Sequence, residues 1–432
     1  MRLSRKITIA LILIILVSTP IFFSKEKSFL KITEISNSFG IKTNLVRIKN
    51  GNVVYVKCRF KYAGVFHNPA EKHGISAVVA ELLCRKIGEL SPEETTEKLK
   101  NQGIEELSIH ALGDHLSLSF YVLKDKAVDA LNFLAPVFTQ PKFTRNDLEF
   151  VKNKYPTILD PKTADPEQLM FDKLLQLLYP NHNYGLNRTG TAEALSSVTE
   201  SDVYQFVREN FTKKKLTVLF CGDLSVFETE SFLKALFSQL PVGEDMPNLF
   251  PEDLTKYPVA EQKDLIIPRE HLGNVLGVMC GMRLDKLNAR EKAALQIIIT
   301  TLFDDTTGDF CEGLRKKQLA YAVEAKILHR SLSSIFYFSV YIRENDLAEY
   351  KKYVEEKISS YQYKLNIKHL KRTREYFSET SQKGFISIRN IEEQIKNHQL
   401  PFTQLPDELF LQVARRLFEK IKIVYIGKVF GE

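Results

Sequence analysis

Two parts of this 432-residue chain repeat one another in order. Val53–Cys58 resembles Val275–Cys280, 222 positions further along, and in both places a polar link and an apolar helical stretch follow. Each half then has an alternating stretch, and each closes on an apolar run that ends in glycine. Four matching segments in one order favour a duplicated α+β domain over chance similarity. The matched pairs are 53–58 with 275–280, 76–90 with 289–303, 116–122 with 335–342, and 216–222 with 422–427.

The alternating stretches have the period-two pattern of half-buried antiparallel strands. Apolar side chains at every second position from Val54 to Phe60 share one face, and the Asn-Gly pair in Lys49–Asn52 predicts a hairpin turn before them. Amphipathic stretches at 199–211 and 347–363 predict helices. We therefore expect two homologous domains, each an antiparallel sheet covered on one side by helices.

The length also favours two domains, because 432 residues exceed what one ordinary hydrophobic core holds. Residues 240–258 contain four prolines in nineteen residues and show no helical period, so they predict a linker. The expected N-terminal domain therefore covers residues 25–239, and the expected C-terminal domain covers residues 259–432.

Composition excludes some classes of protein. The chain is 44 % hydrophobic and 26 % charged, which is typical of globular proteins, and its net charge of +7 is spread along the sequence. This distribution favours a solvated mixed-charge surface over nucleic-acid binding. The five cysteines are odd in number and form no CxxC motif, and most lie among apolar residues, so we expect buried thiols rather than a zinc cluster.

The N-terminus has the pattern of an export signal. Residues 1–6 are basic, and Ile7–Phe23 is a run of seventeen residues without a charge. A mitochondrial presequence would be amphipathic, whereas this run is apolar all round. No good small-x-small cleavage site follows it. We therefore expect residues 1–24 to be a signal peptide or an N-terminal anchor of an exported protein, with residues 7–23 usable as the membrane segment.

Several stretches resemble the insulinase and pitrilysin-like zinc peptidases, the family that includes the subunits of the mitochondrial processing peptidase. In the most specific of them, residues 179–211, glycine, histidine, proline and threonine occupy the positions that the family pattern gives them. The resemblance covers nearly all of the chain after the signal, and it implies two homologous α+β domains that form a half-shell. The quoted stretches are PAEKHGISAVVAELL (69–83), FTRNDLEFVKNKY (143–155), YPNHNYGLNRTGTAEALSSVTESDVYQFVRENF (179–211) and FCEGLRKKQLAYAV (310–323).

Active members of this family carry His-x-x-Glu-His on the first helix of the first domain, where two histidines four residues apart bind Zn²⁺ and the glutamate activates water. The three matching positions here are Ala77, Ala80 and Glu81. The family's third ligand, a glutamate, would fall near Thr157 or Ile158, where this sequence has none. The resemblance therefore implies no catalytic residue, no metal and no cofactor in this chain, with zinc only in a partner subunit.

Two rebuilt sites remain as alternatives. Histidines at 67, 73, 110 and 115, together with Asp114, are candidates for a substitute metal site. Asp114 and His115 also suggest a nucleophile with a base, but no serine or cysteine stands in an elbow-type sequence to complete that arrangement. An active peptidase with unusual ligands would need one of these sites.

A second family feature is an arginine and a tyrosine, seven residues apart, that reach the peptide from the second domain. Anchoring the match on Phe310 places the tyrosine at Tyr321 and the arginine at Leu314, with Arg315 one position further on. A shift of one residue turns a helical side chain by about 100°. The resemblance implies Arg315 and Tyr321 as substrate-binding residues; the alternative is that both serve local structure.

The family contains pairs in which one half-shell holds zinc and the other does not. The resemblance therefore implies a non-catalytic subunit that pairs with a zinc-bearing homologue and positions peptides for proteolysis, with no activity of its own. The alternative is a structural assembly subunit resembling the core proteins of the respiratory cytochrome bc complex. Because the resemblance is to compact bacterial-type half-shells, we expect a periplasmic or exported protein. Its N-terminal run can anchor it to the inner membrane.

Overall fold

The structure is a computed structural model of the whole chain. It describes residues 32–160, 164–187, 189–244, 254–269, 272–383 and 405–428. The predicted signal or anchor at residues 1–24, and residues 245–253 of the predicted linker, lie outside the described residues. In the described part, no helix combines the length and the apolar character needed to cross a bilayer.

The first half of the chain forms a six-stranded sheet in the order β1-β2-β6-β3-β5-β4. Neighbouring strands are antiparallel except for β2 and β6, which run parallel, so the sheet is mixed rather than wholly antiparallel. Parallel neighbours need a long connection, and here the whole chain between β2 and β6, with its strands and helices, supplies it. The strands are β1 (Ile32–Ile35), β2 (Lys42–Arg47), β3 (Val53–Lys61), β4 (Ile104–Ala111), β5 (His115–Leu123) and β6 (Leu216–Gly222).

Helices cover one face of this sheet, as the alternating pattern predicts. The apolar side chains from Val54 to Phe60 are fully buried, and Phe60 stacks on Phe211 with ring centroids 4.3 Å apart. The predicted helix at 199–211 is confirmed as α9. The helices of this half are α2 (Ile75–Arg85), α3 (Pro92–Asn101), α4 (Ala127–Thr139), α5 (Arg145–Lys152), α6 (Tyr155–Leu159), α7 (Pro166–Leu178), α8 (Ala192–Ser196), α9 (Glu200–Asn210) and α10 (Val226–Phe237).

The second half repeats this plan with a five-stranded sheet in the order β7-β11-β8-β10-β9. Here β7 and β11 are the parallel pair. The predicted helices at 289–303 and 347–363 are confirmed as α11 and α13. The elements are β7 (Asp264–Pro268), β8 (Val275–Asp285), β9 (Glu324–His329), β10 (Ser333–Arg343), β11 (Lys422–Gly427), α11 (Ala289–Phe303), α12 (Asp309–Lys316), α13 (Leu347–Tyr363), α14 (Ile367–Lys383) and α16 (Asp407–Leu417).

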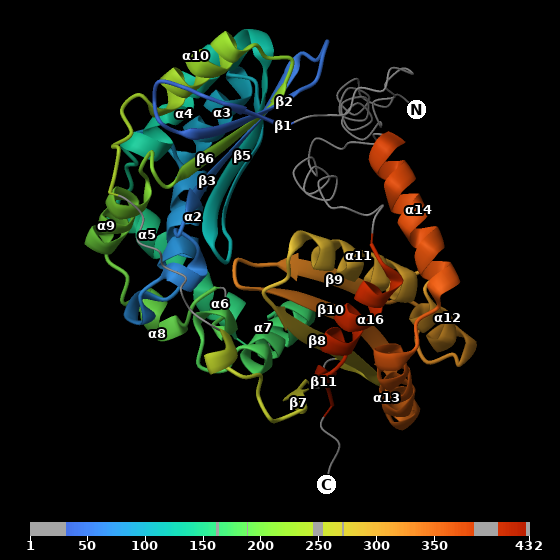
Figure 1. Cartoon of the computed structure of the whole chain (residues 1–432). Coiled ribbons are helices and arrows are strands. Elements are labelled where there is room, and N and C mark those ends of the chain that lie inside the picture. The colour runs from blue at the N-terminus through green and yellow to red at the C-terminus, as the bar shows by residue number, and fades with distance from the viewer. Residues whose placement is uncertain are drawn as a thin grey trace, which may run out of the picture.

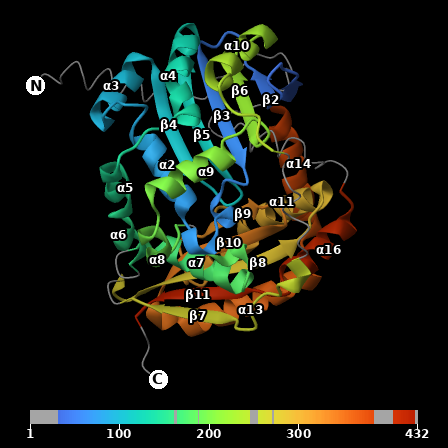
Figure 2. The ribbon, with the colours of Figure 1, turned by 90° about the vertical axis from the view of Figure 1, so that its left-hand side faces the viewer.

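One helix joins the two halves. α7 follows the first-half helices in sequence but packs on the second sheet, beside β8 and β11 (Figure 2). Its side chains Met170 and Leu174 share a buried cluster with Met279, Ile335 and Val424. Because α11, α13 and α16 cover the opposite face, the second sheet is buried on both sides. This apolar contact fixes the relative placement of the two halves.

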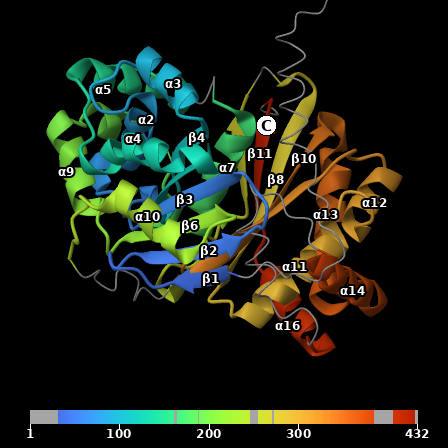
Figure 3. The same cartoon turned by 90° about the horizontal axis from the view of Figure 1, so that it is seen from above.

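Together the halves form the half-shell that the resemblance implies (Figure 1). The helices α2, α4, α9 and α10 lie on its outer side, and the other face of the first sheet looks into the concavity. Seen from above, the two sheets lie side by side with their helices around them (Figure 3). The molecule thus has an α+β fold with two mixed, helix-covered sheets.

Candidate functional site

The helix that carries the degenerate motif, α2, begins at a glycine. Gly74 has a φ of 101°, which residues with a side chain rarely adopt. The Asn68 side-chain oxygen accepts hydrogen bonds from the N–H groups of Gly74 (3.1 Å) and Ser76 (3.3 Å) and from the Ser76 hydroxyl (2.9 Å). These bonds satisfy donors that a helix start leaves without intrahelical partners. The loop thereby fixes the point at which α2 enters the core.

A second loop lies against this helix start. A Cβ on Gly74 would stand 2.9 Å from the Cα of Gly190, and a Cβ on Gly190 would stand 2.5 Å from the His73 carbonyl oxygen. The Nε2–H of His73 donates to the Asn187 carbonyl at 2.6 Å. Burial lowers the pKa of His73, against the opposing effect of this hydrogen bond. The family-like stretches 69–83 and 179–211 therefore meet in space, and His73 has a structural contact there.

The motif positions themselves carry no zinc ligands except one carboxylate. Ala77 and Glu81 lie one turn apart on α2, and Ala80 is buried in the core. Alanine has no lone pair to give to a metal ion. The Glu81 carboxylate forms an ion pair with the Lys154 ammonium group. A cation of the protein therefore contacts the one motif position that still has a ligand-type side chain.

The surroundings of this ion pair are basic. The Arg85 guanidinium lies 3.7 Å from the centre of the Phe150 ring, and Lys154 Nζ lies 4.9 Å from it. Asp147 pairs with Arg85 Nε and with Lys86 Nζ, both at 3.5 Å. Three cationic groups therefore surround two carboxylates on α2, α5 and the turn after α5. This charge balance opposes the binding of a divalent cation.

The position of the family's third ligand does not supply the missing group. The helical segment breaks after α5, and Pro156 stands in the first turn of the short helix α6, where a proline is tolerated. Thr157 is exposed and has no carboxylate, and Ile158 is apolar. The residues present at the degenerate motif therefore do not fit a zinc ion.

Of the alternative metal-binding residues, the structure brings His67 and Asp114 near one another, while His73 and His110 have contacts elsewhere. His67 Nε2 lies 3.7 Å from Asp114, whereas His110 bonds to Ser108 at 2.6 Å and His73 bonds to Asn187. Within the described ranges, no three His, Cys, Asp or Glu side chains form a group that could hold a metal ion. All five cysteines are free thiols, and four of them are buried.

The second-domain residues have different environments. The Arg315 guanidinium, on α12, donates to the carbonyl oxygens of Asp305 and Thr306, so it holds the loop before the helix. Leu314, at the family's arginine position, is fully buried. Tyr321 is 90 % exposed and lies in the segment between α12 and β9. Tyr321 is therefore largely exposed to solvent, while the observed contacts of Arg315 are local.

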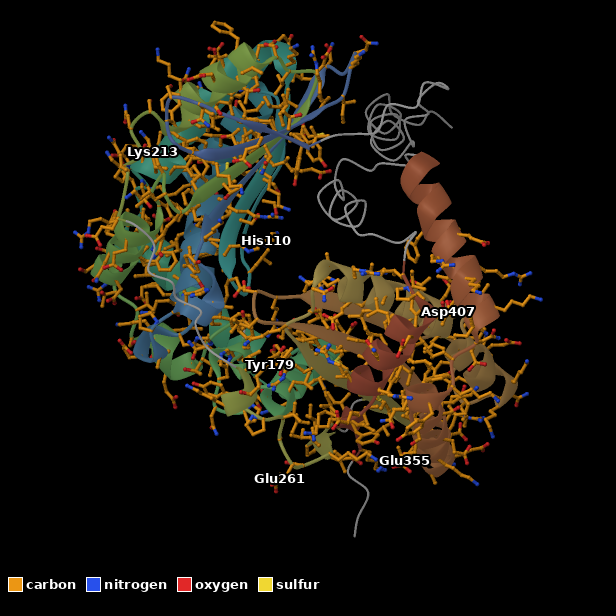
Figure 4. All side chains as sticks on the ribbon, in the orientation of Figure 1. His110, Tyr179, Lys213, Glu261, Glu355 and Asp407 are labelled. Carbon is orange, nitrogen blue, oxygen red and sulfur yellow. The ribbon has the colours of Figure 1, made fainter. Side chains whose placement is uncertain are left out.

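Each sheet has two edge strands in the described part of the chain. These are β1 and β4 in the first sheet, and β7 and β9 in the second. The β4 pairing shifts register between Glu105 and Ser108, and Glu106 has a positive φ of 51°. His110 lies on β4 beside the concavity (Figure 4). Such an edge offers backbone N–H and C=O groups to an added strand.

Sequence reasoning missed two arrangements. The Glu81–Lys154 ion pair joins residues from different helical segments. The sequence signal for it is that Lys154 lies three residues before Thr157, near the position of the family's third ligand. The junction of the halves also has an arginine, Arg330, whose guanidinium lies 4.6 Å from the Phe66 ring centre and 5.3 Å from that of Tyr179. No sequence pattern indicates this stacking.

The comparisons with known proteins agree with this geometry. The family model described as the peptidase M16 inactive domain matches residues 197–377. A Helicobacter pylori protein named non-peptidase homolog YmxG is 27 % identical over 171 residues, 40 % of this chain and 39 % of that protein. A Bacillus subtilis protein named uncharacterized zinc protease YmxG is 24 % identical over 214 residues, 47 % of this chain and 51 % of that protein. The matches span about half or less of these relatives.

The fold comparison covers more of the chain. A crystal structure of a peptidase M16 inactive domain from Pseudomonas fluorescens superposes with a TM-score of 0.79 and 18 % identity, over 93 % of this chain and all of that chain. The fold and the site thus define a peptidase-type half-shell whose zinc motif is degenerate. These matches confirm the resemblance to the M16 peptidase family, the insulinase and pitrilysin group, that the motifs predict.

Proposed function

We propose that this chain is the non-catalytic subunit of an M16 peptidase and pairs with a zinc-bearing homologue. The observation that carries the proposal is the motif helix, where Ala77 stands at a zinc-ligand position, Ala80 stands at the position of the general base, and Lys154 pairs with Glu81 at the second ligand position. A peptidase-type fold that lacks the zinc ligands can still form one wall of a chamber around a peptide. The partner's zinc-bound water performs the hydrolysis.

In this proposal the concave side of the half-shell faces the partner and encloses an extended peptide. The β4 edge supplies main-chain hydrogen bonds, which make little demand on the peptide's sequence. Tyr321, which is largely exposed, is the proposed contact from the second half. Arg315 supports that segment through the loop at Asp305 and Thr306.

We also propose that the protein is exported and stays at the periplasmic face of the inner membrane. The support is the basic start and the uncharged run at residues 7–23, which lie outside the described residues. Fractionation of cells into periplasm and membrane, with and without replacement of two leucines of that run by lysine, tests this location. Retention of the unaltered protein in the cytoplasm would contradict it.

The experiment for the pairing is a peptidase assay with metal analysis on three samples: this protein, a homologue with an intact His-x-x-Glu-His motif encoded in the same genome, and their mixture. We expect turnover in the mixture to exceed that of the homologue, and no stoichiometric metal in this protein. The matched control replaces the homologue's motif glutamate by glutamine, which removes turnover from every sample. Metal and turnover in the isolated chain would refute the proposal.

The structural alternative is separated by co-purification. A stable complex with the zinc-bearing homologue supports the peptidase pair. Recovery with respiratory or envelope-scaffold subunits, and without that homologue, supports a structural assembly subunit instead.

A further inference from the structure

One end of the first sheet brings together the starts of two helices. β5 ends at Leu123 and β6 ends at Gly222, and both ends lie beside Val53: Leu123 is its register partner, and a Cβ on Gly222 would stand 3.1 Å from its carbonyl oxygen. The chain then enters α4 after β5, and α10 after β6. Both helices therefore begin at this end of the sheet.

The two helices run in the same direction. Phe138, near the end of α4, lies 5.1 Å from Phe237, the last residue of α10, measured between ring centroids. The first turns of the helices consequently lie together at the opposite end, with Val128 in α4 and Val226 and Phe227 in α10. This end is at the top of Figures 1 and 2.

Large apolar side chains are exposed here, and we name them the end patch. Their exposed fractions run from 39 % at Val53 to 81 % at Phe227. Val226 and Phe227 are not needed to cap α10, because Ser225 and Glu228 form its complete capping box. Exposed apolar groups gathered at one place mark an interaction surface. The end patch consists of Val53, Leu123, Val128, Val226 and Phe227.

The charges around the end patch are balanced. Arg47 pairs with Asp223, and Lys124 pairs with Glu228. In residues 47–53, 123–129 and 222–228, the other charged side chains are two basic and two acidic residues, Lys49, Lys126, Asp125 and Asp129. A partner recognised by charge would find no excess of either sign here. The apolar side chains are the feature on which recognition depends.

The described chain also begins at this end. The first strand starts at Ile32, which pairs with Val46, and Val46 lies beside Cys221 near the end of β6. The apolar run in the sequence ends at Phe23, nine positions earlier. Nine extended residues span at most about 30 Å. A bilayer that holds residues 7–23 is therefore within reach of the end patch.

We propose that the end patch inserts into the surface of the bilayer that anchors the N-terminus, and so orients the half-shell on the membrane. The inference rests on the proposed anchoring by residues 7–23, and it is independent of the pairing with a zinc-bearing homologue. Apolar side chains exposed at two neighbouring helix starts are suited to the boundary between headgroups and acyl chains. A bilayer is preferred to a protein partner because the chain enters the fold at this end.

The test uses the full chain in nanodiscs of phosphatidylethanolamine and phosphatidylglycerol. A single cysteine is introduced as Phe227→Cys or Val128→Cys, in a Cys84→Ser background, and labelled with an environment-sensitive fluorophore. The other native thiols are buried, and burial raises the pKa of Cys221, Cys280 and Cys311 to about 12, so they react slowly. Tyr363→Cys, at a side chain 71 % exposed on α13, is the matched control.

We expect a blue-shifted emission and at least twofold quenching by lipid-borne quenchers at positions 227 and 128, and neither at position 363. Val226→Ser with Phe227→Ser should remove the quenching at position 128, whereas Tyr363→Ser should not. Emission typical of water at position 227 in nanodisc-bound protein would overturn the proposal. So would a shift that arises only when the zinc-bearing homologue is added, because the end patch would then be a subunit interface. A chain that does not bind nanodiscs overturns the anchor and this proposal together, and leaves the pairing intact.

Discussion

The hydroxyl of Ser331 donates a 3.0 Å hydrogen bond to the carboxylate of Asp114. Asp114 lies in the turn between β4 and β5, and Ser331 lies in the corresponding turn between β9 and β10. The tips of equivalent hairpins in the two halves therefore touch. The Tyr184 hydroxyl donates to the other oxygen of the same carboxylate at 3.2 Å, and His67 lies 3.7 Å from it. One carboxylate thus accepts bonds from both halves of the molecule.

This arrangement predicts a pH-dependent stability. Burial on its own raises the pKa of Asp114, but the nearby His67 ring and the hydrogen bonds from Ser331 outweigh burial and hold the pKa below its usual value. A lowered pKa in the folded state contributes stability above the usual value near 3.9 and loses it as the pH falls through the folded pKa. Asp114→Asn should therefore flatten the loss of stability between about pH 5 and pH 2.

The measurement is the free energy of unfolding from urea titrations at several pH values. At pH 7 we expect Asp114→Asn to cost about 1–3 kcal/mol, because it weakens hydrogen bonds to a partly buried charged group. Asp129→Asn, at an exposed carboxylate on α4, is the control and should change little. An unchanged acid slope in Asp114→Asn would show that this carboxylate does not link stability to pH.

The close approach of two loops gives a second prediction. Gly190 has a φ of 104° and faces the His73 carbonyl oxygen, so Gly190→Ala adds both backbone strain and a clash. We expect it to lower the free energy of unfolding by about 1–3 kcal/mol. Gly88→Ala is the matched control, because Gly88 also has a positive φ, of 60°, but has open space around it. Equal losses in the two variants would show that the contact adds nothing beyond the strain.

The degenerate motif gives a third prediction. Glu81→Gln breaks the ion pair with Lys154, and both side chains are partly exposed. Pairs of this kind contribute less than about 1 kcal/mol, so we expect only a small change in the midpoint of thermal unfolding. If the chain is non-catalytic, Glu81→Gln should also leave the turnover of its mixture with the zinc-bearing homologue unchanged. A large loss of turnover would give Glu81 a chemical role that the ion pair does not indicate.

Much of the fold follows from local pattern. The alternation in β3 and the helices at 289–303 and 347–363 depend on which side chains face the core, and this is visible in the order of residues. The parallel pair β2–β6 and the packing of α7 on the second sheet are not visible there, because both join segments distant in sequence. The duplication predicts two sheets, and it gives no information on which helix crosses between them.

The candidate site divides in the same way. The missing zinc ligand at Ala77 and the missing general base at Ala80 can be read from the sequence, because the absence of a functional group is visible without any geometry. The contacts of Arg315 could not be predicted, because the Asp304–Thr307 loop that receives them is ordered by its own hydrogen bonds: the Asp304 carboxylate accepts bonds from Thr306 and from Thr307. The shape of such a loop depends on hydrogen bonds between residues that fold back on one another. A one-residue shift of an arginine within a motif gives no information on those bonds.

The fourth prediction separates the two residues implied by the family's arginine and tyrosine. Tyr321 is 90 % exposed, so Tyr321→Ala should change the free energy of unfolding by less than about 0.5 kcal/mol. Arg315→Ala removes hydrogen bonds to the carbonyl oxygens of Asp305 and Thr306 and should cost about 1–2 kcal/mol. In the mixture with the zinc-bearing homologue, we expect Tyr321→Ala to raise KM for the peptide by about tenfold, which corresponds to about 1.4 kcal/mol of lost binding.

The comparison distinguishes a substrate contact from local structure. Tyr321→Phe keeps the ring and should retain most of the affinity if the contact is apolar, whereas a hydroxyl contact would make it resemble Tyr321→Ala. Tyr376→Ala, at another exposed tyrosine on α14, is the control for nonspecific loss of aromatic surface. If Tyr321→Ala and Tyr376→Ala both leave KM unchanged, Tyr321 does not contact the peptide, and the second half contributes through its β9 edge or through the enclosing wall alone.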